Sequence, residues 1–506
     1  MQARPTLRQR LSRAAPWLGL GLLTLLQLVL FAAHLPGIHR LPGWFYPPIV
    51  RGLGAGWAMA AVCLLTPWLV HLTLRAARAG HTAGTLTAAL TLGLVTQALF
   101  VPLDANREDS LLARHEGGHG EFHAIAQSTR GHLRDVLQHY DERAEARELG
   151  VFAPTKPPGA LAVYAGLDAL GRGPLAGRFT GLRTLAQLSP RVSGYPDGFV
   201  ASVLLFPLFT ALLLPLVVLL GARLHQRDHA ASAPAPERPP RDLEAGAAAA
   251  VLTATSPALL LITYHLDGAL YPLCAVLALW LVSVAMSMHG PQRGLSLSAR
   301  VLSLATLAGV VFGAGLYVSY SLLPALGLVL GVVAAFGLAT RHAARPLRRS
   351  VLTLLGFTLG AVGVTAAFVL LLDYQPAHRF AAAMRYHDRW KAAVPVGPWR
   401  VWALLEWALY AGFPLVGLLL ARALRSLRHL REARQVTSTL LPLGVVASLL
   451  AVSALSGTNE VARMWLFLLP VAAIAAVPAS ARGRSVEALA AAQLLLALVM
   501  KANQPW

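Results

Sequence analysis

The sequence predicts an all-α polytopic membrane protein, a bundle of about 13 or 14 transmembrane helices. Of its 506 residues 56% are hydrophobic and only 13% are charged, whereas a soluble protein of this size needs much more polar surface. Apolar runs of roughly 18 or more residues, long enough to cross a bilayer, recur along almost the whole chain. These runs are continuous and do not alternate with a period of two, which argues against a transmembrane β-barrel.

The apolar segments predict thirteen spans, in the order 16–35, 56–74, 84–103, 197–221, 244–263, 269–288, 299–318, 321–340, 351–373, 400–421, 438–456, 464–480 and 485–500. A shorter apolar stretch, 159–170, predicts a further helix, and we expect a short true span there. The first segment lacks a convincing cleavage site, so we expect a retained span and not a signal peptide. The Pro/Ala-rich stretch 225–242 predicts a linker, and no internal repeat is obvious.

The net charge of +20 indicates arginine-rich loops on the cytoplasmic side and not nucleic-acid binding. The basic segments are the N-terminus, 75–78, 223–241, 341–349, 422–434 and 482–484. The outer side then receives 104–158, the turn "YHLDG", 374–399 and the turn "SGTNEVAR". If 159–170 crosses fully, 223–241 moves outside, and if it does not, every basic loop falls inside. Cys63 and Cys274 lie in apolar runs and indicate neither a disulfide framework nor a thiolate metal site.

Residues 104–158 form the largest polar block between spans and hold ten of the 23 acidic residues. They predict two amphipathic helices on the membrane surface, near 107–128 and 129–149, because apolar residues recur at helical spacing in the second. Long segments of this kind between spans are often functional.

The stretch "RHEGGHGEFH" contains H-E-x-x-H, the motif that places two zinc-binding histidines one helical turn apart in some proteases. Its three glycines each weaken a helix by about 1 kcal/mol, and no third-ligand extension follows. We therefore favour a polar helix with a glycine break. A metal site remains open as the weaker alternative, with the candidates His115, His119 and His123.

The segment "APTKPPGALAVYAGL" (153–167) ends a block that opens with the acidic "LDANRED". In this order the chain resembles the C-type (GT-C) membrane glycosyltransferases, which use lipid-linked sugars. Their first outer loop begins with an acid, carries surface helices and ends in D-K-P-P-L or T-H-P-P-G before a short helix. Here "TKPPG" has the Lys of one branch and the Thr and Gly of the other.

Three later segments extend the resemblance over much of 84–480. They are similar to the second outer turn, to a later loop with its helix, and to a late turn of prokaryotic members: "TSPALLLITYHLDGALYPL", "HRFAAAMRYHDRWKAAVPVGPWRVWALLEWALYAGFP" and "TNEVARMWLFLLP". The resemblance implies a two-span N-terminal addition (1–83), a catalytic module (84–373) and C-terminal helices with an outer loop at 374–399 (374–506).

The resemblance implies transfer of a sugar from a polyprenyl-phosphate donor to a glycan, lipid or protein acceptor. The reaction would occur on the outer face of a bacterial plasma membrane, with no nucleic acid involved. The resemblance implies no particular cofactor, and it leaves open whether the reaction uses a divalent metal ion.

The resemblance makes Asp104 the general base, with Glu108 and Asp109 as alternatives, although Asp104 in isolation could equally cap a helix. For the donor phosphate we expect basic residues of the outer segments: Lys156, Arg379, Arg385 and Arg389. His265 and Asp267 would orient the acceptor or bind a metal, unless they only form a polar turn. Glu406 lies within a span, where an ionisable group is costly and therefore a functional candidate. Glu460 ranks below it, because it can simply pair with Arg463.

Other classes fit less well. A transporter or lipid flippase predicts inverted repeats and broken helices. An O-antigen polymerase or ligase usually has its large loop late in the chain, whereas here it is early. A zinc protease is the weakest alternative.

Overall fold

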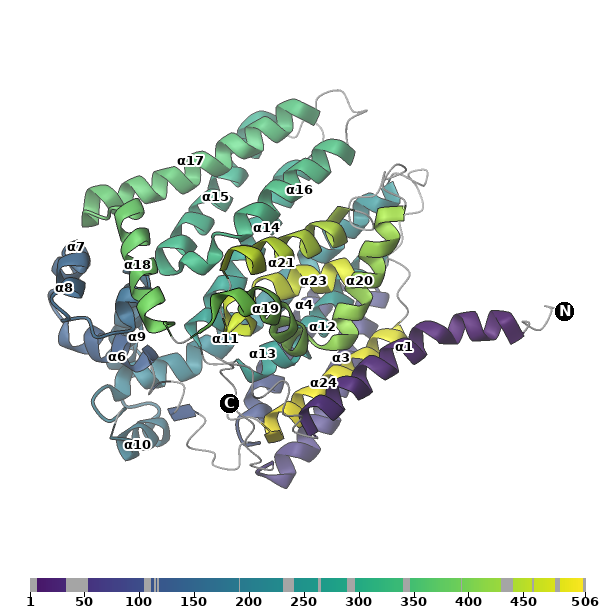
Figure 1. Ribbon diagram of the computed structural model, residues 1–506, viewed down its shortest axis with the longest axis horizontal. Coiled ribbons are helices and arrows are strands. Elements are labelled where there is room, and N and C mark those ends of the chain that lie inside the picture. The colour runs from purple at the N-terminus through teal and green to yellow at the C-terminus, as the bar shows by residue number, and fades with distance from the viewer. Residues whose placement is uncertain are drawn as a thin grey trace.

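The computed structural model describes residues 7–32, 53–103, 111–112, 115, 118–190, 192–230, 241–262, 265–288, 296–339, 346–392, 394–428, 440–456, 459–477 and 483–503. Regular structure in these ranges is helical throughout, without a strand (Figure 1). The predicted all-α polytopic bundle is confirmed, and the protein is a multi-pass membrane protein.

Eight helical segments within the described ranges are long and apolar enough to cross a bilayer. They lie in α3 (Gly56–Arg78), α4 (Thr82–Phe100), α11 (Pro196–Ala230), α14 (Leu266–Ser287), α15 (Leu297–Val318), η2 (Tyr320–Leu322) with α16 (Ala325–Ala339), α17 (Pro346–Leu372) and α24 (Gly483–Asn503). A ninth span is formed if α19 (Val396–Ala411) and α20 (Phe413–Arg428), which meet at 113°, are counted together. The sequence predicted 13 or 14 spans, of which eight or nine meet this length within the described residues.

The other predicted spans are helical but short or interrupted. They correspond to α1 (Leu7–Ala32), α12 (Arg241–Ala254) with α13 (Pro257–Leu261), α21 (Leu441–Ser456), and α22 (Val461–Met464) with α23 (Leu468–Ala476). The segment predicted as 244–263 breaks at Ser256, whose Oγ caps α13 by accepting the N–H of Leu259 at 3.3 Å. Ser before Pro at a helix start is a strong initiation signal, and it overrides the continuous hydropathy.

Glycines let the spanning helices approach backbone to backbone. Gly309 and Gly313 of α15 pack against α17, and Gly356 and Gly360 of α17 pack against α15; the two glycines of each helix are four residues apart. A Cβ on Gly309 would lie 2.0 Å from the carbonyl oxygen of Phe357, so no side chain fits there. Small residues at this spacing are typical of tight helix contacts in membranes.

Polar helices gather at one end of the bundle, at the left in Figure 1. They are α6 (Gly118–Ser128), α7 (Leu133–Gln138), α8 (Tyr140–Glu145), η1 (Ala153–Thr155), α9 (Gly159–Arg172) and α10 (Thr180–Leu188), with α18 (Pro376–Trp390) beside them. We call this the polar end. Of the two surface helices expected near 107–128 and 129–149, the first corresponds to α6, with most of the residues before Gly118 outside the described ranges, and the second is divided into α7 and α8 at His139.

Basic residues mark other helix ends. Arg223 at the end of α11 bonds Ser287 at the end of α14, and Arg349 near the start of α17 donates to the carbonyl of Met286 at 3.2 Å. α14 begins and α17 ends at the polar end, so these arginines lie at the opposite end of the same helices. This separation agrees with the charge asymmetry in the sequence.

Helix α9 was expected as a short true span, and its dimensions argue against this. Its 14 residues extend about 21 Å at about 1.5 Å per residue, short of the roughly 30 Å of hydrocarbon. Its Asp168 accepts two hydrogen bonds from Arg130, at 2.6 and 2.8 Å, and one from Arg172. This ionic contact fastens α9 to the end of α6, so α9 is a surface helix of the polar end.

Candidate functional site

The segment 151–159, which we call the K-P-P corner, is held by one carboxylate from α6. Oε2 of Glu121 accepts the backbone N–H groups of Val151, Phe152 and Ala153 at 3.1, 2.7 and 3.2 Å. Three donors converging on one oxygen form an anion nest built from the backbone. The corner that carries Lys156 is therefore fixed by an acid thirty residues earlier in the chain.

The glycine at the end of the corner is required by close packing. A Cβ on Gly159 would lie 2.2 Å from the carbonyl oxygen of Tyr317, at the end of α15. α9 can therefore begin only against the bare backbone of a spanning helix. The Gly in "TKPPG" positions the corner against the bundle.

Arg379 of α18 binds the protein itself. Its side chain is 1% exposed, pairs with Asp141, donates to the carbonyl of Pro154 and lies 5.2 Å over the ring of Tyr140. The hydroxyl of Tyr140 in turn donates to the carbonyl of Ala153 at 2.8 Å. The expectation that Arg379 binds the donor phosphate is therefore corrected, since its charge is committed to Asp141 and it fastens α18 to the corner.

The end of α18 meets the turn "TNEVAR". Lys391 Nζ lies 3.2 Å from Oε1 of Glu460 and donates to Oδ1 of Asn459. Arg463 lies 2.6 Å from the other oxygen of Glu460, which confirms the pair expected from the sequence. Two cations from different segments thus share one carboxylate whose side chain is 8% exposed.

Glu406 lies directly behind this turn. Its side chain is buried in α19, and its two oxygens accept the N–H groups of Glu460 at 3.1 Å and of Ala462 at 3.2 Å. Glu460 has a left-handed backbone with φ of 62°, a conformation that costs energy for a residue with a side chain. Glu406 compensates for this strain by binding the N–H groups that the turn exposes, which is the supporting role among those expected for it.

Electrostatics link Lys156 of the corner to the same place. Burial, together with the positive charges of Lys391 and Lys156, lowers the pKa of His387 to about 4. Burial opposes ionisation of Glu460, but Arg463 and Lys391 outweigh it and hold the pKa of Glu460 below its usual value. We call this group of five side chains the cation cluster: Lys156, His387, Lys391, Glu460 and Arg463.

Three of the sequence motifs therefore converge in the cation cluster. The K-P-P corner lies more than two hundred residues before the end of α18, and the "TNEVAR" turn starts 67 residues after Lys391, but the three lie close together at one half-buried place. The cluster holds three basic side chains, Lys156, Lys391 and Arg463, and one carboxylate, Glu460, so its net charge is positive and suits an anionic ligand.

A second group of side chains, the histidine cage, lies beside the cluster. His115, His119 and His123 are at most 4% exposed, and His265 at the start of α14 lies 5.0 Å from His119, ring centre to ring centre. Nε2 of His123 is 3.3 Å from Nδ1 of His115, and Nδ1 of His119 is 2.8 Å from the hydroxyl of Tyr164.

A metal site at these histidines, the weaker alternative from the sequence, finds no support among the described residues. Within the described residues no three His, Cys, Asp or Glu side chains come together so as to hold a metal ion. Burial, together with the neighbouring His115 and His119, keeps the pKa of His123 well below its usual value, so His123 is neutral. Glu116, the acid of the H-E-x-x-H pattern, lies outside the described residues.

The glycines of the motif serve packing. A Cβ on Gly118 would lie 2.3 Å from the ring of Phe152, and one on Gly120 would lie 2.5 Å from the carbonyl oxygen of His115. Phe152 also connects the two groups, since its ring lies 5.6 Å from Nζ of Lys156 and 5.4 Å from the ring of His119. The cage and the cation cluster are thus neighbours separated by one aromatic ring.

The remaining predicted site residues are placed as follows. Asp104, Glu108 and Asp109 lie outside the described residues, as does the side chain of Asp267, although its backbone belongs to the first turn of α14. Arg385 and Arg389 are exposed on α18, and the guanidinium of Arg389 lies 5.6 Å from the ring centre of Tyr386.

Some ionic residues of the polar end were not singled out from the sequence. Asp197 at the start of α11 pairs with Arg183 of α10 and lies 3.7 Å from Arg130, beside the Arg130–Asp168 pair. The i, i+4 spacing of Asp168 and Arg172 was the one local signal for this network. Its other contacts join residues distant in sequence, which spacing alone does not reveal.

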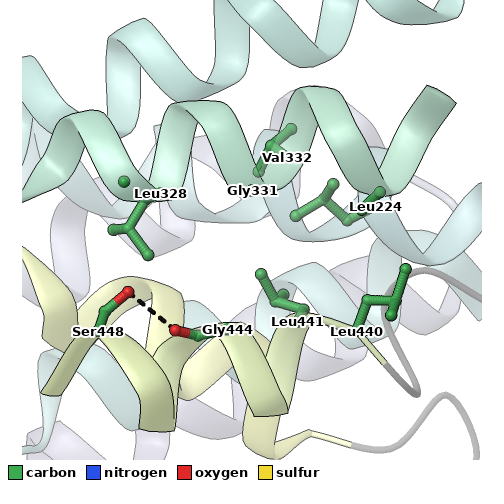
Figure 2. Close-up of a pocket in the computed structure, with 10 residues that line it drawn as sticks. Leu224, Leu328, Gly331, Val332, Leu440, Leu441, Gly444 and Ser448 are labelled. Carbon is green, nitrogen blue, oxygen red and sulfur yellow. Dashed lines mark hydrogen bonds between the residues drawn. The ribbon is translucent and has the colours of Figure 1, made fainter. Parts of the chain in front are cut away.

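An apolar hollow lies among the spanning helices and carries no charged residue. Figure 2 shows it between α16 and α21, with Leu328, Val332 and Leu441 in its wall. Its volume is about 60 Å³. Its labelled hydroxyl, on Ser448, donates to the carbonyl of Gly444 in the same helix at 2.8 Å. Its lining therefore offers no charged group to a polar ligand.

No family model, curated protein or solved structure matches this chain.

Proposed function

We propose that the protein is a membrane glycosyltransferase that transfers a sugar from a polyprenyl-phosphate donor to an acceptor on the outer face of a bacterial plasma membrane. The observation that carries this proposal is the convergence of Lys156, Lys391 and Arg463 around Glu460 at the polar end. A half-buried group of cations at the end of a spanning bundle suits a ligand with an anionic head and an apolar tail.

The chemistry that this site would support is displacement at the anomeric carbon of the sugar. The acceptor hydroxyl oxygen bonds that carbon while its proton passes to the general base, for which we propose Asp104. The bond between the carbon and the phosphate oxygen breaks, and lipid phosphate leaves with the bonding electrons. Lys156, Lys391 and Arg463 would stabilise the charge that develops on the leaving phosphate.

A carrier or flippase is the main alternative, and the helix breaks at α12/α13 and α19/α20 favour it. In carriers, the backbone groups freed at such breaks face the transported substrate. Here protein side chains bond the backbone groups freed at the α19/α20 break, namely the carbonyls of Leu409 and Ala411 and the N–H of Phe413. Because protein side chains already bond these backbone groups, the break has a structural role. This supports a transferase in preference to a carrier.

Purified protein in lipid vesicles tests the proposal with a radiolabelled polyprenyl-phosphate sugar and a panel of acceptors. We expect transfer by the wild type, and a loss of at least about a hundredfold in Asp104→Asn, the size typical of a general base. Lys391→Met should also lower transfer, while Arg425→Met, an exposed arginine of α20 outside the cluster, should not.

Two results would overturn the proposal. One is the absence of transfer from every lipid-linked donor by folded wild-type protein, together with movement of substrate across the vesicle membrane. The other is full activity in both Asp104→Asn and Lys391→Met.

A further inference from the structure

The break between α19 and α20 is a sharp turn inside the bundle. α19 ends at Ala411, α20 begins at Phe413, and their axes meet at 113°. Gly412 between them has φ of +92°, which residues with a side chain rarely adopt. A break of this kind frees the last carbonyl groups of one helix and the first N–H groups of the next, which is costly where no water can reach them.

Two glutamines from opposite ends of the sequence satisfy these groups. Gln27 of α1 donates to the carbonyl of Leu409 at 2.6 Å and accepts the N–H of Phe413 at 2.7 Å. Gln493 of α24 donates to the carbonyl of Ala411 at 3.1 Å. Both glutamine side chains are fully buried, so each replaces water for the backbone of the break.

The second glutamine also contacts the neighbouring break. Oε1 of Gln493 accepts a hydrogen bond from Thr255 at 3.0 Å, at the end of α12. A Cβ on Gly412 would approach Nε2 of Gln493 to 3.3 Å and Cδ of Pro257 to 3.8 Å. The two breaks therefore lie against each other, with one amide bonded to both.

We propose that Gln27 and Gln493 form a glutamine clamp that fixes the direction of α19 and so positions the cation cluster. α19 carries Glu406 six residues before Gly412, a distance of about 9 Å along the helix. Glu406 binds the turn at Glu460, and Glu460 binds Lys391. A change in the direction of α19 would move Glu406 away from this turn.

The clamp gives the first and last helices a part in the site. Sequence comparison with the GT-C pattern treats residues 1–83 as an addition, yet Gln27 contributes two of the hydrogen bonds at the break. The significance of the cation cluster rests on the proposed transferase function, whereas the clamp itself is a statement about helix geometry. The two are tested by separate measurements.

Distances between spin labels test the clamp without any substrate. Cys63 and Cys274 are first replaced by Ala, and labels are placed at the exposed positions Val401 of α19 and Leu424 of α20. We expect one narrow distance distribution in this background. Gln27→Met and Gln493→Met, which keep the side-chain length but remove the amides, should broaden or shift it, and the double variant most of all.

Gln97→Met is the matched control. Gln97 is also a buried glutamine, but its amide bonds the carbonyls of Gly93 in its own helix and of Pro207 in α11 and no backbone group of the α19/α20 break. Gln27→Glu keeps the acceptor for Phe413 and should retain more of the original distribution than Gln27→Met. If Gln27→Met fails to fold, Gln27→Glu and Gln493→Met carry the test. An unchanged distribution in every folded clamp variant overturns the proposal.

A transfer assay then tests the link to the cation cluster. Clamp variants should lose kcat on the order of tenfold with KM for the donor nearly unchanged, because misplaced groups weaken the transition state more than binding. Equal kcat in the clamp variants and the wild type would overturn the positioning role even if the distances change. Wild-type protein without any transfer contradicts the proposed function and leaves the distance result to judge the clamp.

Discussion

The ammonium of Lys391 lies 3.2 Å from the carboxylate of Glu460, and this contact joins the loop after α18 to the turn before α22. Arg463 binds the other oxygen of the same carboxylate at 2.6 Å. One acidic side chain therefore holds two cations at the place where three distant segments meet. The contact makes Glu460 the residue through which the polar end is assembled.

Glu460→Gln should lower the free energy of unfolding by about 3 kcal/mol, because removing one member of a buried ionic group leaves the others uncompensated. Denaturant unfolding in detergent, followed by circular dichroism, measures the change. Glu148→Gln is the control, since Glu148 forms an exposed pair with Arg143 and should change stability by less than about 1 kcal/mol. Equal effects of the two substitutions would show that the Glu460 pairs contribute little.

The pH dependence of stability should carry a contribution from His387. Its pKa in the folded protein is about 4, below the usual value of about 6.5, so the unfolded chain binds more protons between these values. This contribution is fully present above about pH 6.5 and is lost as the pH falls towards 4. Melting temperatures measured across this range should fall less steeply with acid in His387→Leu. A slope identical to that of the wild type would contradict the assignment.

Gly159→Ala should disrupt the K-P-P corner, since the new Cβ would lie 2.2 Å from the carbonyl oxygen of Tyr317. We expect a loss of about 2 kcal/mol in stability or a failure to fold, as for other overpacked sites. Gly166→Ala on the same helix is the control, because no atom lies within 4 Å of its added Cβ. It should stabilise α9 by about 0.5–1 kcal/mol. Comparable melting temperatures for the two variants would argue against the close contact.

Glu121→Gln should loosen the corner while leaving the spanning helices intact. The amide loses the charge that three backbone N–H groups now bind, at a cost of about 1–3 kcal/mol. Amide hydrogen exchange at Phe152 and Ala153 should become faster, with exchange in α15 unchanged. Glu142→Gln, an exposed acid of α8, should leave both regions as they are. Protection at 152–153 that survives in Glu121→Gln would contradict this role.

The sequence predicts where helices lie better than where they stop. The structure has a helix at every span predicted from hydropathy, because a helix in lipid needs apolar residues in either orientation across the membrane. It missed the break at Gly412, which interrupts an apolar run without adding a charge. The local signals were present, "TSP" before α13 and "GFP" before α20, but hydropathy averages over them.

Site residues were predicted unevenly for a related reason. Lys156 and Glu406 were chosen because a charge is unusual where they lie; Lys156 belongs to the cation cluster, and Glu406 binds the backbone of the turn that carries Glu460. Arg379 was chosen on the same ground, but its partner Asp141 lies 238 residues away and no spacing reveals the pair. The glycines of the H-E-x-x-H pattern suggested a helix break, whereas Phe152 and the backbone at His115 are what require them.

The glycine seam between α15 and α17 has a consequence for biogenesis. These helices are the first and third of three consecutive spanning segments, so they run in the same direction. The contact between α15 and α17 therefore cannot form until α17 has been synthesised. Until then α15 lies in the lipid with Gly309 and Gly313 exposed. A chaperone or the insertion machinery could meet the nascent chain at that stage. Truncation after residue 345 should leave α15 without α17 to pack against, and we expect the truncated polypeptide to be degraded.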